Sequence, residues 1–152
     1  MIRIERDPAF WTRIAAHPEV APLLMGLPAE TVGALATRRD MLPIADIHGG
    51  FMFGRLDALG FVCELHTLFT PEGWGREAMV AGVQALGVVW ALGYQAILTF
   101  ETSTNPKSRP PRTFGFVQAA EWRVTPLGEL RLWTLTRSGW DASPIRRLKC
   151  LH

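Results

Sequence analysis

The sequence predicts one α/β domain built on a mixed β-sheet. Three observations predict this class: helical signals fill the N-terminal third, strand-like runs joined by glycine-containing turns follow from Met41, and a long helical segment then separates two strand-like runs. The length of 152 residues and the 48% hydrophobic content suit a single core. Residues 1–152 are therefore interpreted as one domain.

The N-terminal third is predicted to be helical. Asp7 followed by Pro8 supplies an N-cap and a first-turn proline for a helix that should run to about Ala16, where His17 and Pro18 end it. Further short helices are expected in the stretches PEVAPLL and PAETVGALATRR. The first six residues, MIRIER, are expected only to lead into the first helix.

The sheet is predicted to begin with an antiparallel meander. Its strands are the runs LPIADI, FMFGRL and FVCELHTLF, which tight glycine-containing turns separate. Alternation along the third run places Val62, Glu64, His66 and Leu68 on one face. Two titratable side chains therefore point the same way.

A helix is expected over residues 75–92, followed by Gly93 at the position where helices commonly end. Its apolar stripe recurs at helical spacing at Met79, Val83, Leu86 and Trp90. The internal glycines, Gly82 and Gly87, are interpreted as sites of close packing on the sheet. The run YQAILTF should then form a strand parallel to the one that ends at Phe69, because a crossover helix joins the two.

The C-terminal part is predicted to close the sheet. Pro110 and Pro111 restrict any helix after the strand YQAILTF to a short turn. FVQAAEWR and ELRLWTLTR are expected to form a hairpin around TPLG, and SGWDASPIRRLKCLH is expected to be a tail. The tryptophan-containing hairpin and tail offer a surface for a second copy or for protein assembly.

Composition excludes several function classes. A net charge of +2 does not favour a nucleic-acid or membrane partner, and no apolar run reaches the roughly 18 residues of a membrane span. Cys63 and Cys150 lack metal-ligand spacing, which favours a cytoplasmic protein with reduced thiols. His48 is expected to be a hairpin-turn residue, and with His17 and His152 it forms no visible metal site.

The stretch TPEGWGREA leads from a strand into a helix N-terminus, where unpaired backbone N–H groups favour an anion such as a phosphate. Gly73 and Gly75 permit close approach of a ligand, and Arg76 adds positive charge. One alternative is an ordinary turn that binds nothing. Another is a dinucleotide site, since GWGREA satisfies G-x-G-x-x-A and Glu101 ends the next strand.

Between about Met41 and Trp140 the chain resembles the GNAT superfamily of N-acetyltransferases, and its short proline-containing segment is similar to that of phage-associated members. The landmarks are, in order, helices, the meander, LFTPEGWGREA, a long helix, a strand, NPKS, FGF and a closing hairpin. The resemblance implies a GNAT-like mixed sheet whose two central parallel strands splay apart. Aligned on Pro71 and Glu72, the family pattern has Trp74, Glu77 and Met79 in place of its Gln/Arg, its first Gly and its last Gly or Ala. Aligned on Gly73 and Gly75, it has Thr70 in place of the Gln/Arg. Either register leaves a pyrophosphate to backbone N–H groups.

The resemblance also implies a co-substrate, acetyl-coenzyme A, and an amine as acceptor. A backbone N–H near Leu68 or Phe69 would polarise the thioester carbonyl. Lys107 and Arg112 are further candidates to meet phosphates. The implied cofactor-binding residues are Leu68, Phe69, Gly73, Trp74, Gly75, Arg76, Glu77, Ala78, Asn105, Ser108 and Arg109.

The acceptor amine must lose a proton, and Glu64 and His66 are the candidate catalytic residues for this step. A histidine titrates near neutral pH, and burial is expected to raise the pKa of Glu64. Family members often use a tyrosine as the general acid, but Phe114 stands near that place and the sole tyrosine is Tyr94, so Ser108 or water would substitute. The alternative is a catalytically inactive GNAT-fold binding or assembly protein of phage origin.

Overall fold

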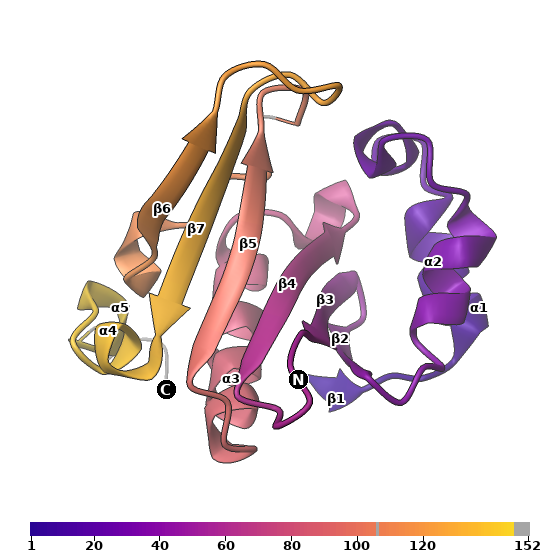
Figure 1. The fold of residues 1–152 in the computed structure, drawn as a ribbon. Coiled ribbons are helices and arrows are strands. Elements are labelled where there is room, and N and C mark those ends of the chain that lie inside the picture. The colour runs from indigo at the N-terminus through magenta and orange to yellow at the C-terminus, as the bar shows by residue number, and fades with distance from the viewer. Residues whose placement is uncertain (106, 148–152) are drawn as a thin grey trace.

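The alternating runs of the sequence form one mixed, seven-stranded sheet in the computed structural model, which describes residues 1–105 and 107–147 (Figure 1). The strand order is β1-β2-β3-β4-β5-β7-β6. The strands are β1 (Arg3–Ile4), β2 (Met41–Asp46), β3 (Gly49–Arg55), β4 (Val62–Phe69), β5 (Ala96–Thr102), β6 (Val117–Trp122) and β7 (Leu130–Thr136).

Helices cover both faces of this sheet. The long helix α3 (Arg76–Ala91) lies behind the sheet in the view of Figure 1, whereas α1 (Pro8–Ala15) and α2 (Ala29–Leu35) stand together beside β2, β3 and β4. Two short helices, α4 (Arg137–Asp141) and α5 (Pro144–Arg147), follow β7. Single 3₁₀ turns are η1 (Ala21–Leu24), η2 (Pro71–Gly73) and η3 (Arg112–Phe114).

Most of the predicted elements are confirmed. The meander β2-β3-β4 is antiparallel, and α3 carries the chain to β5, which is parallel to β4. Asp7 caps α1 as expected, because its carboxylate accepts a hydrogen bond from the Ala9 N–H at 2.9 Å. Gly93 follows the C-cap of α3 with a φ of 95°.

Two features differ from the predictions. Residues in MIRIER form the short strand β1, which pairs with β2, and the expected tail forms α4 and α5 up to Arg147. In addition, β7 lies between β5 and β6, an order that the predicted hairpin left open. Nothing local in the sequence specifies this last arrangement, because it depends on pairing between β5 and a strand that comes 28 residues later, from Thr102 to Leu130. Cys150 and His152 lie outside the described residues.

The sheet separates two hydrophobic cores. The larger core lies between the sheet and α3 and includes Cys63, Phe69, Ile97 and Leu135. The smaller core lies under α1 and α2, where Trp11 and Ile14 pack with residues of β2, β3 and β4. Consecutive residues of β4 therefore alternate between two environments, and Leu68 contributes to the smaller core while Phe69 contributes to the larger one.

The two internal glycines of α3 have different surroundings. A Cβ at Gly82 would lie 3.0 Å from Cε2 of Phe114, so this glycine permits close packing as predicted. Gly87 is exposed, and a Cβ there would meet nothing within 4 Å. The packing role predicted for Gly87 is therefore wrong, because this position faces away from the sheet.

This contrast gives a stability prediction within one helix. Gly87→Ala should stabilise the protein by about 0.5–1 kcal/mol, because alanine costs less backbone entropy in a helix. Gly82→Ala should be less stable than Gly87→Ala by about 1 kcal/mol, because the Phe114 ring must move to admit the methyl group. Urea unfolding of both variants measures the difference, and equal free energies of unfolding would contradict the close contact at Gly82.

Candidate functional site

The central parallel strands part beyond their first residues. The ladder between β4 and β5 joins only residues 62–64 to residues 96–98. At the next step the Thr99 hydroxyl, which is 8% exposed, donates to the Leu65 carbonyl at 3.0 Å. A side chain thus satisfies an acceptor that a strand N–H would satisfy in a continued ladder. The predicted splay of the two strands is present in the structure.

The pairing of β4 with β3 shows which backbone groups of β4 face this opening. Leu56 N–H donates to Val62 O at 3.0 Å, and Thr70 N–H donates to His48 O at 2.9 Å. Even-numbered residues of β4 therefore bond toward β3, and odd-numbered ones face β5. Of the two predicted thioester-polarising groups, the Phe69 N–H is directed to the opening and the Leu68 N–H is not.

The turn after β4 presents the N-terminus of α3. Gly75, with φ 77° and ψ −123°, has a conformation that favours glycine, and its carbonyl accepts the Met79 N–H at 3.1 Å. The N–H groups of Arg76, Glu77 and Ala78 precede this first helical hydrogen bond, so the helix itself does not satisfy them. This predicted segment therefore has the backbone geometry of an anion site.

The β2–β3 turn holds this segment in place. The His48 carbonyl accepts hydrogen bonds from Thr70 N–H and from the Thr70 hydroxyl, the latter at 3.3 Å. His48 Nε2 lies 3.8 Å from a carboxylate oxygen of Glu77 in the first turn of α3. A Cβ at Gly73 would lie 2.7 Å from the His48 Cβ, so glycine is needed for this approach. The expectation that His48 is a turn residue is confirmed.

Trp74 closes one end of the opening. Its indole N–H donates to the Phe69 carbonyl at 2.9 Å, and this carbonyl is one of the β4 groups that face β5. The Lys107 ammonium lies over the same ring, 2.7 Å from its centroid. The turn and the loop after β5 thus meet through this pair, a contact that the sequence reasoning did not predict.

The polar side chains of the loop after β5 are used within the loop. The Asn105 side-chain carbonyl accepts from Lys107 N–H at 3.0 Å. The Ser108 hydroxyl accepts from Thr102 N–H at 2.8 Å and donates to the Asn105 carbonyl at 2.6 Å. Arg109 lies with its guanidinium carbon 5.7 Å from the Trp133 ring centroid. Cofactor contacts by Asn105, Ser108 and Arg109 stay predictions.

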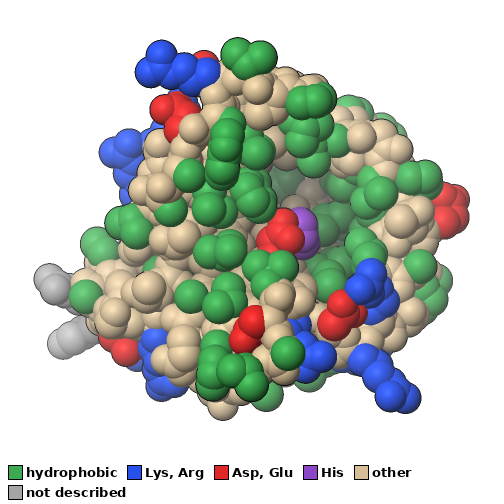
Figure 2. Space-filling model, in the orientation of Figure 1, with side chains coloured by type: hydrophobic (Ala, Val, Ile, Leu, Met, Phe, Trp, Pro, Cys, Tyr) green, Lys and Arg blue, Asp and Glu red, His purple; other side chains and the backbone are tan. Residues whose placement is uncertain are grey.

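Glu64 and His66 lie side by side on β4, on the face opposite to α3. A Glu64 carboxylate oxygen is 3.5 Å from His66 Nε2, and the two side chains are 27% and 50% exposed. Figure 2 shows a histidine together with an acidic side chain at a hollow of this face. The hydrogen bond from His66 holds the pKa of Glu64 below its ordinary value and outweighs the opposing effect of burial. The expectation of a raised pKa for Glu64 is therefore wrong, because the hydrogen bond outweighs burial.

This pairing gives a prediction about Glu64. Because folding lowers the pKa of this carboxyl, its contribution to stability is present above about pH 4.5 and is lost as the pH falls through the folded-state pKa. His66→Ala should raise the pKa of Glu64, whereas His48→Ala should leave it unchanged because His48 contacts Glu77 instead. Carboxyl-carbon NMR titration measures both, and an unchanged pKa in His66→Ala would contradict the pairing.

The residues considered as a general acid lie elsewhere. Phe114 is 5% exposed and packs edge-on against Trp140 at 5.8 Å, so its position belongs to the core. Tyr94 precedes β5, and burial raises its pKa. Burial also raises the pKa of the Cys63 thiol to about 12, which leaves it protonated and unreactive at neutral pH. These positions therefore do not supply the general acid that the resemblance implies.

The structure also bears on the other site classes. Within residues 1–105 and 107–147, no group of three His, Cys, Asp or Glu side chains is placed to hold a metal, and no helix is long and apolar enough to span a membrane. The dinucleotide alternative is wrong at the level of fold, because β4 and β5 form the one parallel pair of the described sheet. Glu101 instead accepts from the Trp133 indole at 2.8 Å.

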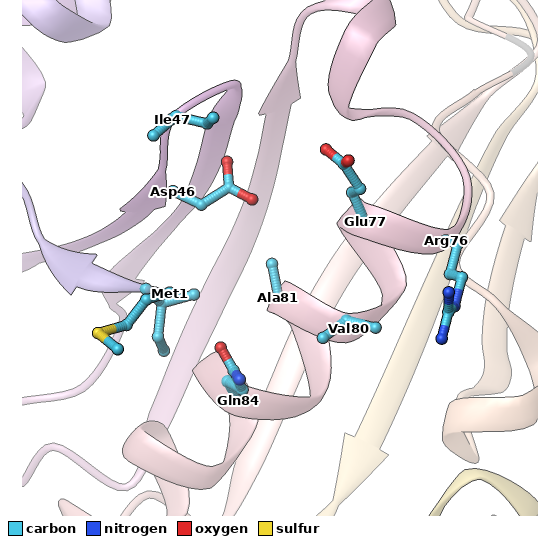
Figure 3. Close-up of a pocket in the computed structure, with 9 residues that line it drawn as sticks. Met1, Asp46, Ile47, Arg76, Glu77, Val80, Ala81 and Gln84 are labelled. Carbon is cyan, nitrogen blue, oxygen red and sulfur yellow. The ribbon is translucent and has the colours of Figure 1, made fainter. Parts of the chain in front are cut away.

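A separate hollow of about 340 Å³ flanks α3 on its other side. Figure 3 shows Asp46 and Glu77 beside it, from β2 and from the first turn of α3, and Arg76 also lines it. The two carboxylates disfavour an anion in this hollow. The phosphate site that the sequence predicts at the N-terminus of α3 stays a prediction.

Comparison with solved structures identifies the fold. A probable GNAT-family acetyltransferase from Chromobacterium violaceum is 19% identical with a TM-score of 0.68, covering 93% of this chain and 90% of that one. A mutant spermidine N-acetyltransferase from Vibrio cholerae is 15% identical with a TM-score of 0.65, covering 93% and 96%. An acetyltransferase of the GNAT family from Bacillus anthracis is 14% identical with a TM-score of 0.64, covering 90% and 98%.

These likenesses show that the chain has the GNAT fold, as the resemblance in its sequence implied. No protein-family profile and no curated protein matches the sequence. The association with phage proteins has no support among these structures.

Proposed function

We propose that this protein is an acyltransferase that moves an acetyl group from acetyl-coenzyme A to a primary amine by direct attack on the thioester. The observation that carries the proposal is the splay of β4 and β5, which ends at a helix N-terminus with unsatisfied backbone N–H groups. Glu64 and His66 lie on the same strand and face the other side of the sheet from α3. Donor and acceptor would therefore approach β4 from different sides.

The backbone fits the donor in two respects. The odd-numbered groups of β4 beyond Leu65 have no β5 ladder, so an extended amide chain can pair with them as an added strand. The N–H groups of Arg76, Glu77 and Ala78 would hold the pyrophosphate, and exposed Lys107 and Arg112 would meet the remaining phosphate. Acetyl-coenzyme A would supply the activated acyl group.

Trp74 would have to accommodate the donor. Its indole N–H occupies the Phe69 carbonyl, and the Lys107 cation covers its ring. A donor that pairs with the Phe69 carbonyl would require the indole to move. A donor that binds without using this carbonyl would leave the indole in place as one wall of the site. The Phe69 N–H faces the same opening and would donate to the thioester carbonyl as negative charge develops there.

Glu64 and His66 would prepare the acceptor. The Glu64 carboxylate, whose pKa the hydrogen bond from His66 holds below its ordinary value, would attract the ammonium form of the amine. The imidazole of His66 would accept the proton that the amine releases before attack, directly or through a water. Protonation of the leaving thiolate would come from water, since the Phe114 position offers no hydroxyl.

The second candidate is a GNAT-fold protein that binds the coenzyme or a protein partner without turnover. The observation that favours it is that Phe114, which stands near the place where the resemblance implies a tyrosine, is buried and has no hydroxyl. The two candidates differ in one measurable respect, because only the first forms acetylated amine and free thiol in equal amounts.

The first experiment is a titration with acetyl-coenzyme A, followed by melting temperature and tryptophan fluorescence. The melting temperature should rise saturably, and NAD should have no effect. The fluorescence change should be lost in Trp74→Phe and retained in Trp122→Phe, because Trp122 lies on β6, two strands beyond β5. Absence of any response to acetyl-coenzyme A would overturn the donor site.

Kinetic variants test the acceptor chemistry. Glu64→Gln and His66→Ala should each lower kcat by about 10²-fold or more, the usual range for loss of a general base and its partner. Glu121→Gln serves as the control and should retain kcat, because Glu121 lies on β6, pairs with Arg131 and faces away from the acceptor side. Activity within twofold of wild type in both test variants would exclude this pair as the base.

A further inference from the structure

The acceptor side of the sheet has a second feature, a row of apolar side chains beside Glu64. Residues paired across neighbouring strands point to the same face of a sheet. The pairs Glu64 with Leu98, Phe100 with Leu132, and Trp122 with Leu130 therefore place one carboxylate and five apolar side chains on this face. We call the five residues Leu98, Phe100, Trp122, Leu130 and Leu132 the apolar wall.

The charged residues of the same strands lie on the opposite face. Glu101, Arg131 and Glu121 are paired across β5, β7 and β6. Arg131 joins them, with nitrogen–oxygen distances of 3.5 Å to Glu101 and 3.0 Å to Glu121. No charged side chain of β5, β6 or β7 therefore lies within the apolar wall.

The apolar wall is open to solvent. Phe100 is 37% exposed and Trp122 is 45% exposed. The core under α1 and α2 draws on residues of β2, β3 and β4, such as Met52 and Leu68, and on none of the described residues of β5, β6 or β7. Figure 1 shows α1 and α2 on one side of this face and β5, β7 and β6 on the other, and Figure 2 shows hydrophobic side chains bordering the hollow between them.

The combination of one carboxylate with an apolar wall selects among amines. A polyamine such as spermidine carries several ammonium groups, and all but one would lie against leucine and aromatic side chains and lose their hydration. An amine with a single charge and a hydrocarbon body would pair its ammonium with Glu64 and bury its body on the wall.

We propose that the acceptor is a primary amine with one positive charge on a hydrophobic body, an alkylamine or arylalkylamine rather than a polyamine. The kinetic test of this inference rests on the proposed acetyl transfer. A second test measures only the binding of the amine and needs no turnover.

The kinetic test compares hexylamine and phenethylamine with spermidine at saturating acetyl-coenzyme A. The value of kcat/KM should be at least about tenfold higher for the two apolar amines, which corresponds to burial of about two methylene groups. Phe100→Glu should lower kcat/KM for hexylamine about tenfold and raise it for spermidine. Gln118→Glu is the matched control, because Gln118 is exposed on β6 and pairs with Trp133 on the opposite face.

The binding test uses calorimetry with coenzyme A present, and circular dichroism of each variant confirms folding. Tighter binding of hexylamine than of spermidine supports the inference even if no amine is acetylated, and in that case only the proposed catalysis fails. Tighter binding of spermidine, binding of none of the amines, or equal effects of Phe100→Glu and Gln118→Glu would overturn it. Acetyl-coenzyme A binding is measured separately, so failure of the donor site is recognised on its own.

Discussion

The rest of the site depends on the point at which β4 and β5 stop pairing. After the step from Glu64 to Leu98, the Thr99 hydroxyl satisfies the Leu65 carbonyl and the ladder ends. Unpaired backbone N–H and C=O groups inside a protein are costly, so an opening of this kind persists only where side chains or a ligand satisfy the strand edges. At the far end, the Trp74 indole satisfies the Phe69 carbonyl. The groups between these two contacts are those that a donor would use.

β4 would serve both proposed sites, because successive residues of the strand face opposite sides of the sheet. Leu65 and Phe69 pack toward α3, and Glu64 and His66 face the side of α1. The two proposed sites therefore share one strand, which pairs with β3 along its whole length. A displacement of β4 would change the proposed donor opening and the proposed acceptor face together.

The sheet also separates its charges from its apolar surface. Arg131 gathers Glu101, Glu121 and Glu129 on the α3 side of β5, β7 and β6, where the Trp133 indole also donates to Glu101. An exposed ion pair contributes little to stability, and the direction of these side chains follows from alternation along the paired strands. The opposite face is left apolar beside Glu64, and this arrangement gives the proposed acceptor side its chemical character.

The sequence by itself determined the elements and the landmarks of the fold. Asp7 with Pro8, the alternation in FVCELHTLF and the glycines of TPEGWGREA act through neighbouring residues, so a linear reading can find them. Only the tertiary structure decided the position of β7 between β5 and β6, the burial of Phe114, the contact of Lys107 with Trp74 and the lowered pKa of Glu64. The first three depend on side chains or strands that folding brings together. The pKa of Glu64 depends on the balance between burial and a hydrogen bond, and spacing along the chain carries no information about that balance.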